Sequence, residues 1–376
     1  MNPQDYLKKA MTINSFDEVR DRVVKLHDQN FPDQIVDMSK VRVRQDGNKK
    51  RPGLLFEVPR LGMLTMTSHS ERQIGSMLGC QFGKWFDPEI MKPEEIQREL
   101  QLRFSRRNLS CKVRARRHPK GAPATKYSDG FARAFLSPSY SPIDDIRIFD
   151  RLKKRFGRSI GDHGFLKNHL GTDYYNDRAS HYTVVGDMVD LGPIDRNHPN
   201  KSVRDIYDIA EQEGALPDND WVCQCYHLRN SEVGFTAITI DSTTFRLVCL
   251  NGAVISVKDG RLLYRMHRSI SDDDIDTLLD GAFRKMPTAF EHNKRRMTAL
   301  QQRVVEEPDA EIKAFLERQK ASKGFIEKVQ EAYKEEPLGT AYGILQAMTR
   351  AAKSESDMEK RLELEELGGR FLARAA

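Results

Sequence analysis

A block of positive charge carries the clearest chemistry in this sequence. Between Arg103 and Lys120 the chain has eight Lys or Arg residues and neither Asp nor Glu. Such side chains bind phosphates, and each phosphate that they neutralise releases counterions into the solvent. The block therefore predicts contact with a polyanion. Its members are Arg103, Arg106, Arg107, Lys112, Arg114, Arg116, Arg117 and Lys120.

Aromatic residues and two further arginines follow the block. Tyr127 and Tyr140 offer flat faces on which unpaired bases can stack, and Arg133 and Arg147 add positive charge nearby. We expect these residues to extend the block into a surface for single-stranded nucleic acid, DNA in the first place. In the competing interpretation the arginines pair with neighbouring acids and the aromatic side chains fill the core.

A region rich in Gly, Asn and Asp holds the best candidates for metal chemistry. Its residues His163, Asp173, Asp177 and His181 are of types that ligate divalent cations. They define an alternative function, a metal-dependent nuclease or related DNA-processing enzyme, and a solvated loop is the simpler interpretation. For the acidic run at residues 272–274 we favour charge compensation at a helix N-terminus over metal binding.

The familiar catalytic motifs are absent from the chain. The segment GCQFGKW, which begins at Gly79, has the wrong glycine spacing for a phosphate-binding loop and Trp85 where a hydroxyl must bind magnesium. Neither HExxH, nor a pair of CxxC motifs, nor GxSxG occurs. We therefore expect no nucleotide hydrolysis, no metal and no cofactor, and a binding protein in preference to an enzyme.

A helix and a hairpin must position the basic block. Pro93 opens a predicted helix, and the sequence LSCKVRARR from Leu109 then alternates like a strand with one basic face. After a basic Gly/Pro loop, FARAFLS from Phe131 reads as the partner strand of a hairpin. A helix with a basic side follows from Ile143. The loop of the hairpin is long enough to be functional.

Strands and helices are also predicted on either side of this region. Ser15 and Glu18 form a capping box for a helix over residues 15–29, and short strands follow from Val41, Gly53 and Gly62. Ser68 starts a second helix, which ends near Gly79. Further on, the run from Trp221 to His267 has the alternation and turns of a β-meander, and three cationic side chains on it are secondary candidates for nucleic-acid contact: Arg246, Arg265 and His267.

From Ser271 the pattern becomes helical up to the end of the chain. Pro287 is expected to kink or break the first of these helices, because proline removes one backbone hydrogen bond. The predicted fold class is α+β: an antiparallel β-meander core packed with helices, followed by a helical C-terminal arm. We place the domain boundary so that residues 1–270 form the α+β core and residues 271–376 the helical region.

The composition is that of a soluble protein with a charge-rich surface. Charged residues make up 31% and hydrophobic residues 39% of the 376 residues, and the formal net charge is +6. Five cysteines, an odd and scattered set, argue against a disulfide framework. The sequence shows neither a signal peptide nor an apolar stretch of transmembrane length, so we expect a cytoplasmic protein of a bacterial cell that has no membrane partner.

Several ordered motifs resemble a known family. They are GFARAFLSPSYSPIDDIRIFDRL from Gly130, VVGDMV, SEVG from Ser231, FRLVCLNGAVI and the final RMH. They resemble a phage- and plasmid-like family that is catalogued as a domain of unknown function, over roughly residues 60 to 305. The resemblance places the family's motif residues at Arg133, Tyr140, Asp144 or Asp145, Arg246, Cys249, Asn251, Gly252 and His267.

The resemblance implies a component of a mobile element, and the combination of meander, helices and basic surface is similar in outline to phage single-strand annealing proteins. We therefore expect a phage or mobile-element protein that binds single-stranded DNA, forms homo-oligomers and promotes annealing and recombination. The third hypothesis is a non-catalytic factor, such as a host-defence antagonist, whose basic face binds an acidic protein.

Overall fold

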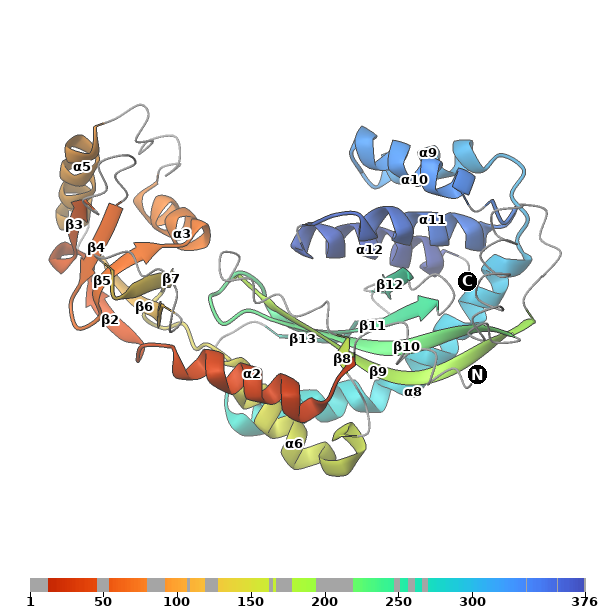
Figure 1. The fold of residues 1–376 in the computed structure, drawn as a ribbon, viewed down its shortest axis with the longest axis horizontal. Helices are drawn as coiled ribbons and strands as arrows, with labels where there is room; N and C mark the ends of the chain where they lie inside the picture. The colour runs from red at the N-terminus through yellow and green to blue at the C-terminus, as the bar shows by residue number, and fades with distance from the viewer. Residues whose placement is uncertain are drawn as a thin grey trace.

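The fold was analysed in a computed structural model. It describes residues 13–45, 54–79, 92–106, 109–118, 128–161, 165–166, 178–193, 219–246, 251–255, 261–265, 270–335, 337–356 and 358–374. Two β-sheets, largely antiparallel, lie at opposite ends of an elongated molecule and are covered by helices (Figure 1). The protein is therefore of the α+β class, as the sequence predicts.

The first sheet has six strands and forms, with two helices, the part that we call the N-terminal lobe. The strand order is β2-β6-β7-β5-β4-β3, so β2 and β3 are its edges. All neighbours are antiparallel except β5 and β7. The elements are β2 (Gln34–Asp37), the 3-10 turn η1 (Met38–Lys40), β3 (Arg42–Gln45), β4 (Leu54–Val58), β5 (Gly62–Met66), α3 (Ser68–Leu78), α5 (Pro93–Arg106), β6 (Ser110–Arg117) and β7 (Gly130–Leu136).

The predicted hairpin of the basic block is confirmed. Strands β6 and β7 pair antiparallel, with Lys112 opposite Leu136. Helix α3 begins at Ser68, as predicted, and Thr67 accepts the capping hydrogen bond at its N-terminus. It ends at Leu78, and the C-cap Gly79 has a left-handed backbone that favours glycine. The apolar side of the sheet packs with α3 and α5 around Phe56, Phe104 and other buried residues.

The second sheet contains the predicted meander. Strands β10 and β11 pair antiparallel, and both β12 and β13 pair antiparallel with successive parts of β11. Strand β9 lies on the other side of β10. We call this sheet the meander sheet; its strands are β1 (Ile13–Asn14), β8 (Phe165–Leu166), β9 (Ser180–Pro193), β10 (Asn219–Asn230), β11 (Ile238–Arg246), β12 (Asn251–Ile255) and β13 (Arg261–Arg265).

Three helices cover one face of the meander sheet. They are α2 (Phe16–Asp28), α6 (Asp145–Gly161) and α8 (Asp272–Gln302), and Figure 1 shows them below the sheet. Alternate strand residues point toward these helices, so that Leu228 and Ile240 share one core with Phe149 and Leu279. The capping boxes at Ser15 and Ser271 are both present.

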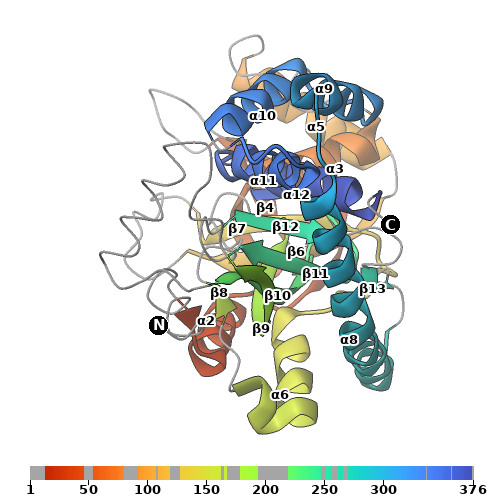
Figure 2. The same ribbon diagram turned by 90° about the vertical axis from the view of Figure 1, so that its right-hand side faces the viewer.

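Four further helices form the C-terminal region, as predicted: α9 (Pro308–Arg318), α10 (Lys323–Glu335), α11 (Ala341–Lys353) and α12 (Met358–Ala373). In Figures 1 and 2, α11 and α12 lie between the meander sheet and the pair α9 and α10. These helices share a hydrophobic core with the end of α8. Helix α8 lies after the predicted domain boundary at residue 270, yet several of its residues belong to the core below the sheet. The domain boundary remains a prediction.

Helix α8 passes through Pro287 without ending. Its helical assignment runs from Asp272 to Gln302. Met286, Ala289 and Phe290, which flank the proline, are all buried, and their packing offsets the lost hydrogen bond. Pro287 therefore does not break the helix, and a kink at this position remains a prediction.

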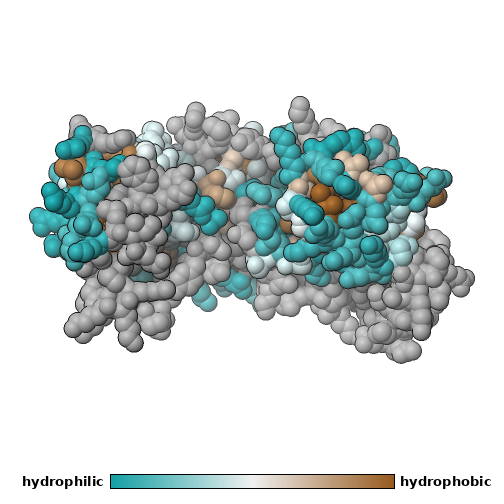
Figure 3. All heavy atoms as spheres, turned by 90° about the horizontal axis from the view of Figure 1, so that it is seen from above, coloured by the Kyte–Doolittle hydropathy of each residue, from teal (hydrophilic) through white to brown (hydrophobic). Residues whose placement is uncertain are grey.

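None of the described helices is long and apolar enough to cross a lipid bilayer. Hydrophilic side chains dominate the surface seen from above, with small apolar patches over the C-terminal helices and the N-terminal lobe (Figure 3).

The hairpin depends on one glycine at the start of β7. A Cβ atom on Gly130 would lie 2.2 Å from the carbonyl oxygen of Arg116 on the neighbouring strand. We expect Gly130→Ala to lower the free energy of unfolding by about 1–3 kcal/mol, because backbone must move to relieve the contact. Urea unfolding measures the change. Gly281→Ala in α8, where nothing lies within 4 Å, should instead stabilise by about 1 kcal/mol; equal losses in both variants would contradict the prediction.

Candidate nucleic-acid interface

Three arginines of the predicted interface lie in the interior. Arg114, Arg116 and Arg133 are only 4%, 6% and 3% exposed. They come from adjacent positions of β6 and β7, which the hairpin register brings together. The basic face of β6 therefore points inward at these positions, contrary to the expected exposed surface. Buried guanidinium groups do not contact a phosphate backbone in this arrangement. They are buried because they neutralise a buried carboxylate.

That carboxylate belongs to Glu232, in the turn between β10 and β11. Arg133 Nη1 lies 2.7 Å and Arg116 Nη2 lies 3.9 Å from Glu232 Oε2. Arg114 Nη1 donates a 2.7 Å hydrogen bond to the backbone carbonyl of the same residue. The second carboxylate oxygen accepts a 2.9 Å hydrogen bond from the backbone N–H of Asp145. One buried acid thus binds two strands of the N-terminal lobe and the start of α6.

Two aspartates at the start of α6 complete this buried network. Arg114 Nη2 lies 2.6 Å from Asp144 Oδ1, and its Nε lies 3.0 Å from Asp33 Oδ1. The Asp145 side chain accepts hydrogen bonds of 2.7 Å from Asn230 Nδ2 and 2.8 Å from the Tyr182 hydroxyl. We call the set Arg114, Arg116, Arg133, Asp144, Asp145, Asn230 and Glu232 the buried charge network.

Burial and charge push its two central carboxyl groups in opposite directions. Burial raises the pKa of Asp145 to about 7, and the negative charge of Glu232 adds to the rise. Burial alone would also raise the pKa of Glu232, but Arg133, Arg114 and Arg116 outweigh it and hold that pKa at about 2. Glu232 is therefore ionised at neutral pH, and Asp145 is the group that exchanges a proton near pH 7.

The network brings together several residues of the motifs named above. The Tyr140 hydroxyl donates to the backbone carbonyl of Ser231 at 3.3 Å. Gly234 has a φ of +76°, and a Cβ there would lie 2.7 Å from Leu136 Cδ2, so the SEVG turn requires glycine for both reasons. Two of the motifs that resemble the family, the segment from Gly130 and the SEVG turn, thus meet at the junction of the two sheets.

Other members of the basic block lie nearer the surface, and most have partners. Arg103 forms a 2.7 Å ion pair with Glu99, and Lys112 donates to the backbone carbonyl of Tyr140. Arg147 joins α6 to α8 through Asp272, at 2.6 Å. Arg106 and Arg117 are exposed, and the guanidinium of Arg117 lies 4.4 Å from the centre of the Phe31 ring.

Some predicted site residues lie outside the described residues: Arg107, Lys120, Tyr127 and His267. Arg246 lies on β11 opposite Val222, and Arg265 lies on β13 opposite Ile238. The sheet places the two arginines at opposite ends of β11, and whether any of these residues contacts nucleic acid remains a prediction.

Of the four residues proposed for a metal-dependent nuclease, the structure describes one, His181. His163, Asp173 and Asp177 lie outside the described residues. His181 is buried on β9, where its Nδ1 lies 3.2 Å from His227 Nε2. Within the described part of the chain no group of three or more His, Cys, Asp or Glu residues is arranged to hold a metal ion.

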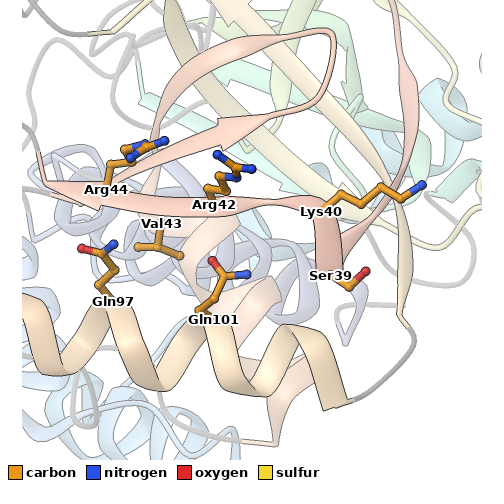
Figure 4. A pocket seen from close by; sticks show the side chains of 7 residues that line it. All are labelled: Ser39, Lys40, Arg42, Val43, Arg44, Gln97 and Gln101. Atoms are coloured by element: carbon orange, nitrogen blue, oxygen red, sulfur yellow. The ribbon is translucent and has the colours of Figure 1, made fainter.

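A cationic pocket lies at the edge of the N-terminal lobe, between β3 and α5. Its volume is about 440 Å³, and Figure 4 shows the side chains that line it. Three are basic, two are amides and none of the described lining residues is acidic. They are Ser39, Lys40, Arg42, Val43, Arg44, Gln97 and Gln101, and we call this the β3–α5 pocket.

The alternation of β3 arranges these side chains. Val43 points toward α5 and is buried, whereas Arg42 and Arg44 leave the strand on its other side and are exposed (Figure 4). Gln97 and Gln101 reach up from successive turns of α5, and the Gln101 amide donates to the carbonyl of Val41 at 3.0 Å.

The basic residues of the pocket differ in how strongly they are held. Arg44 is paired with Glu57 on β4, at 2.8 Å. Lys40 and Arg42 form no ion pair with another described residue and are exposed. Sequence reasoning predicts the strand from VRVR but misses this site. The available clue was that Lys40, Arg42 and Arg44 alternate with apolar residues.

The network predicts a large stability cost for one isosteric change. Glu232→Gln leaves Arg133 and Arg116 buried without their counter-charge, and we expect the free energy of unfolding to fall by about 3–5 kcal/mol. Urea titration at constant m-value measures it. The control is Asp150→Asn, which removes the more exposed Arg20–Asp150 ion pair and should cost about 1 kcal/mol or less. A loss at Glu232 as small as that of the control would contradict the expectation.

The raised pKa of Asp145 predicts how stability depends on pH. Between pH 4 and pH 7 the folded protein holds a proton on Asp145 that the unfolded chain has lost, since the pKa rises from 3.8 to about 7. Stability contributed by this group is therefore present at low pH and declines toward pH 7, on the order of 1 kcal/mol per pH unit. Asp145→Asn should flatten this decline in unfolding curves taken from pH 5 to pH 8; an unchanged slope would contradict it.

Comparison with known proteins adds one match. Residues 203–363 match a family described as a domain of unknown function (DUF932). No curated protein and no solved structure matches the chain. The matched residues include Glu232, the described strands β10 to β13 and helices α8 to α11, and they exclude the N-terminal lobe. The family expected from the sequence is also one of unknown function, and the match at residues 203–363 fits that expectation.

Proposed function

We propose that this protein binds single-stranded DNA at the β3–α5 pocket and promotes the annealing of complementary strands without hydrolysing nucleotides. One observation carries the proposal: Lys40 and Arg42 are exposed, unpaired with any described acid, and line a pocket that has amide donors and no described carboxylate. Clustered cations of this kind suit a chain of phosphates.

The pocket offers two kinds of contact. Arg42 and Arg44 occupy alternate positions of one strand, so their side chains start about 6.8 Å apart on the same face. Glu57 on β4 pairs with Arg44, and Arg42 forms no ion pair with another described residue. The Gln97 side chain forms no hydrogen bond with another described residue, so its amide is available to a base edge or sugar. The arginines, on the side of β3 away from α5, would bind the backbone of the nucleic acid, and the amides on the α5 side would position it where it crosses this edge.

The arginines of the buried charge network have an indirect role in this proposal. They anchor the hairpin β6–β7 to Glu232, and the hairpin in turn supports β5, β4 and the edge strand β3. The network therefore holds the surface that meets DNA, whereas Arg106 and Arg117 are the exposed residues of the basic block that can extend it.

Annealing itself is proposed from the electrostatics. Neutralised phosphates allow two complementary strands to approach, and alignment of several copies of the protein would present one strand along its length. The motif resemblance to a phage- and plasmid-like family supports a role in recombination of a mobile element.

Replacing two cations tests the site. Lys40→Gln/Arg42→Gln should weaken binding of a labelled oligonucleotide and make the slope of log affinity against log salt shallower by about 1.4, because two phosphate contacts of about 0.7 each are lost. Fluorescence anisotropy over a salt series measures the slope, and annealing of labelled complementary oligonucleotides measures the activity.

The matched control is Lys153→Gln/Lys154→Gln, which removes two exposed cations from α6 and should leave the slope unchanged. Binding and annealing should also persist when a chelator is present, whereas cleavage by a metal-dependent nuclease would be lost. Absence of oligonucleotide binding at low salt, or equal effects of the two double variants, would overturn the proposal.

A further inference from the structure

A second basic pocket lies far from β3, in the C-terminal helical region. It is formed where the end of α8 meets α9 and the C-terminal end of α12, and its volume is about 250 Å³. That is the room of roughly eight liquid waters at about 30 Å³ each, enough for an acidic side chain. Its described lining is Arg303, Glu311, Phe315, Arg318, Phe371 and Arg374.

Two buried phenylalanine rings form the rigid base of this pocket. Phe315 and Phe371 are 1% and 3% exposed and meet edge to face, with ring centres 5.1 Å apart. The guanidinium of Arg374 lies 4.9 Å from the Phe315 ring centre, and that of Arg303 lies 5.8 Å from the Phe371 ring centre. Cation–π contacts thus hold two arginines in place before any ligand arrives.

The charge of the pocket is only partly compensated. Glu311 is its one carboxylate, and it is bound by both terminal nitrogens of Arg303, at 3.2 and 2.5 Å. Arg318 and Arg374 are exposed and form no ion pair with another described residue. A cation in the last turn of a helix is favoured by the helix dipole. Arg318 lies in the last turn of α9, and it converges on one cavity with Arg303 at the end of α8 and Arg374 just after α12.

We propose that this pocket binds carboxylate side chains of an acidic peptide segment in a partner protein. Arginine forks match carboxylate geometry, and two of them that lack an acidic partner can each donate a pair of hydrogen bonds. The pocket is separate from the β3–α5 pocket, so it gives the protein a second, independent binding function: recruitment of a protein partner.

The surroundings favour a short acidic segment over a nucleic acid. In the sequence from residue 303 to residue 331, acids are interspersed with the cations, so a continuous chain of phosphates bound along this region would have to cross negative side chains. A few carboxylates need only the pocket itself. Acids of this part of the chain are Glu306, Glu307, Asp309, Glu317, Glu327 and Glu331.

The test uses the full chain and a fluorescein-labelled peptide in which Asp alternates with Gly. We expect this peptide to bind at least about tenfold more tightly than the same peptide with Asn in place of every Asp, as measured by fluorescence anisotropy. Arg318→Glu/Arg374→Glu should weaken binding of the Asp peptide by at least about tenfold. Both side chains are exposed, so the variant should keep the wild-type unfolding curve and oligonucleotide affinity.

The matched control is Lys313→Glu/Lys328→Glu, which makes the same change of charge on exposed positions of α9 and α10 outside the pocket. It should retain peptide binding within about twofold. Equal binding of the Asp and Asn peptides would overturn the proposal. Equal losses in the two double variants would overturn it too, because attraction would then depend on net charge alone.

Discussion

Burial of the Glu232 carboxylate is the constraint on which this structure depends. A carboxylate removed from water must be neutralised, and Arg133, Arg116 and Arg114 provide the neutralising charge from the hairpin of the other sheet. Its remaining oxygen binds the start of α6. Because the partners come from separate sheets, the same interactions that satisfy one acid also set how the N-terminal lobe joins the meander sheet.

This junction changes the meaning of the basic block. High positive charge without acids nearby in sequence suggests a surface, yet the acids that pair with these arginines are distant along the chain: Asp33 lies before the block and Asp144 and Glu232 follow it. Local charge density therefore identified residues that hold the protein together. Within the described residues, positive charge at the surface includes the cations of the β3–α5 pocket, Arg106 and Arg117, and the arginines of the pocket in the C-terminal helices.

The two pockets differ in what surrounds their cations. The β3–α5 pocket combines an amide-bearing helix with the cations of an edge strand, a combination that suits an extended polyanion. In the C-terminal pocket, arginines are fixed on aromatic rings and enclosed by mixed charge, which suits a few carboxylates. A protein that holds single strands with one site and a partner with the other would couple DNA binding to recruitment.

The sequence by itself determined the elements. Capping residues such as Ser15 and Ser271, the alternation of β6 and β7, and the turns of the meander all act over a few residues, so each was predictable from local physics. What covers each face was decided only by the tertiary structure. Whether Arg114 meets solvent or Asp144, and whether α8 survives Pro287, depends on side chains brought from far along the chain, and the free energy of their packing and pairing outweighs local preference.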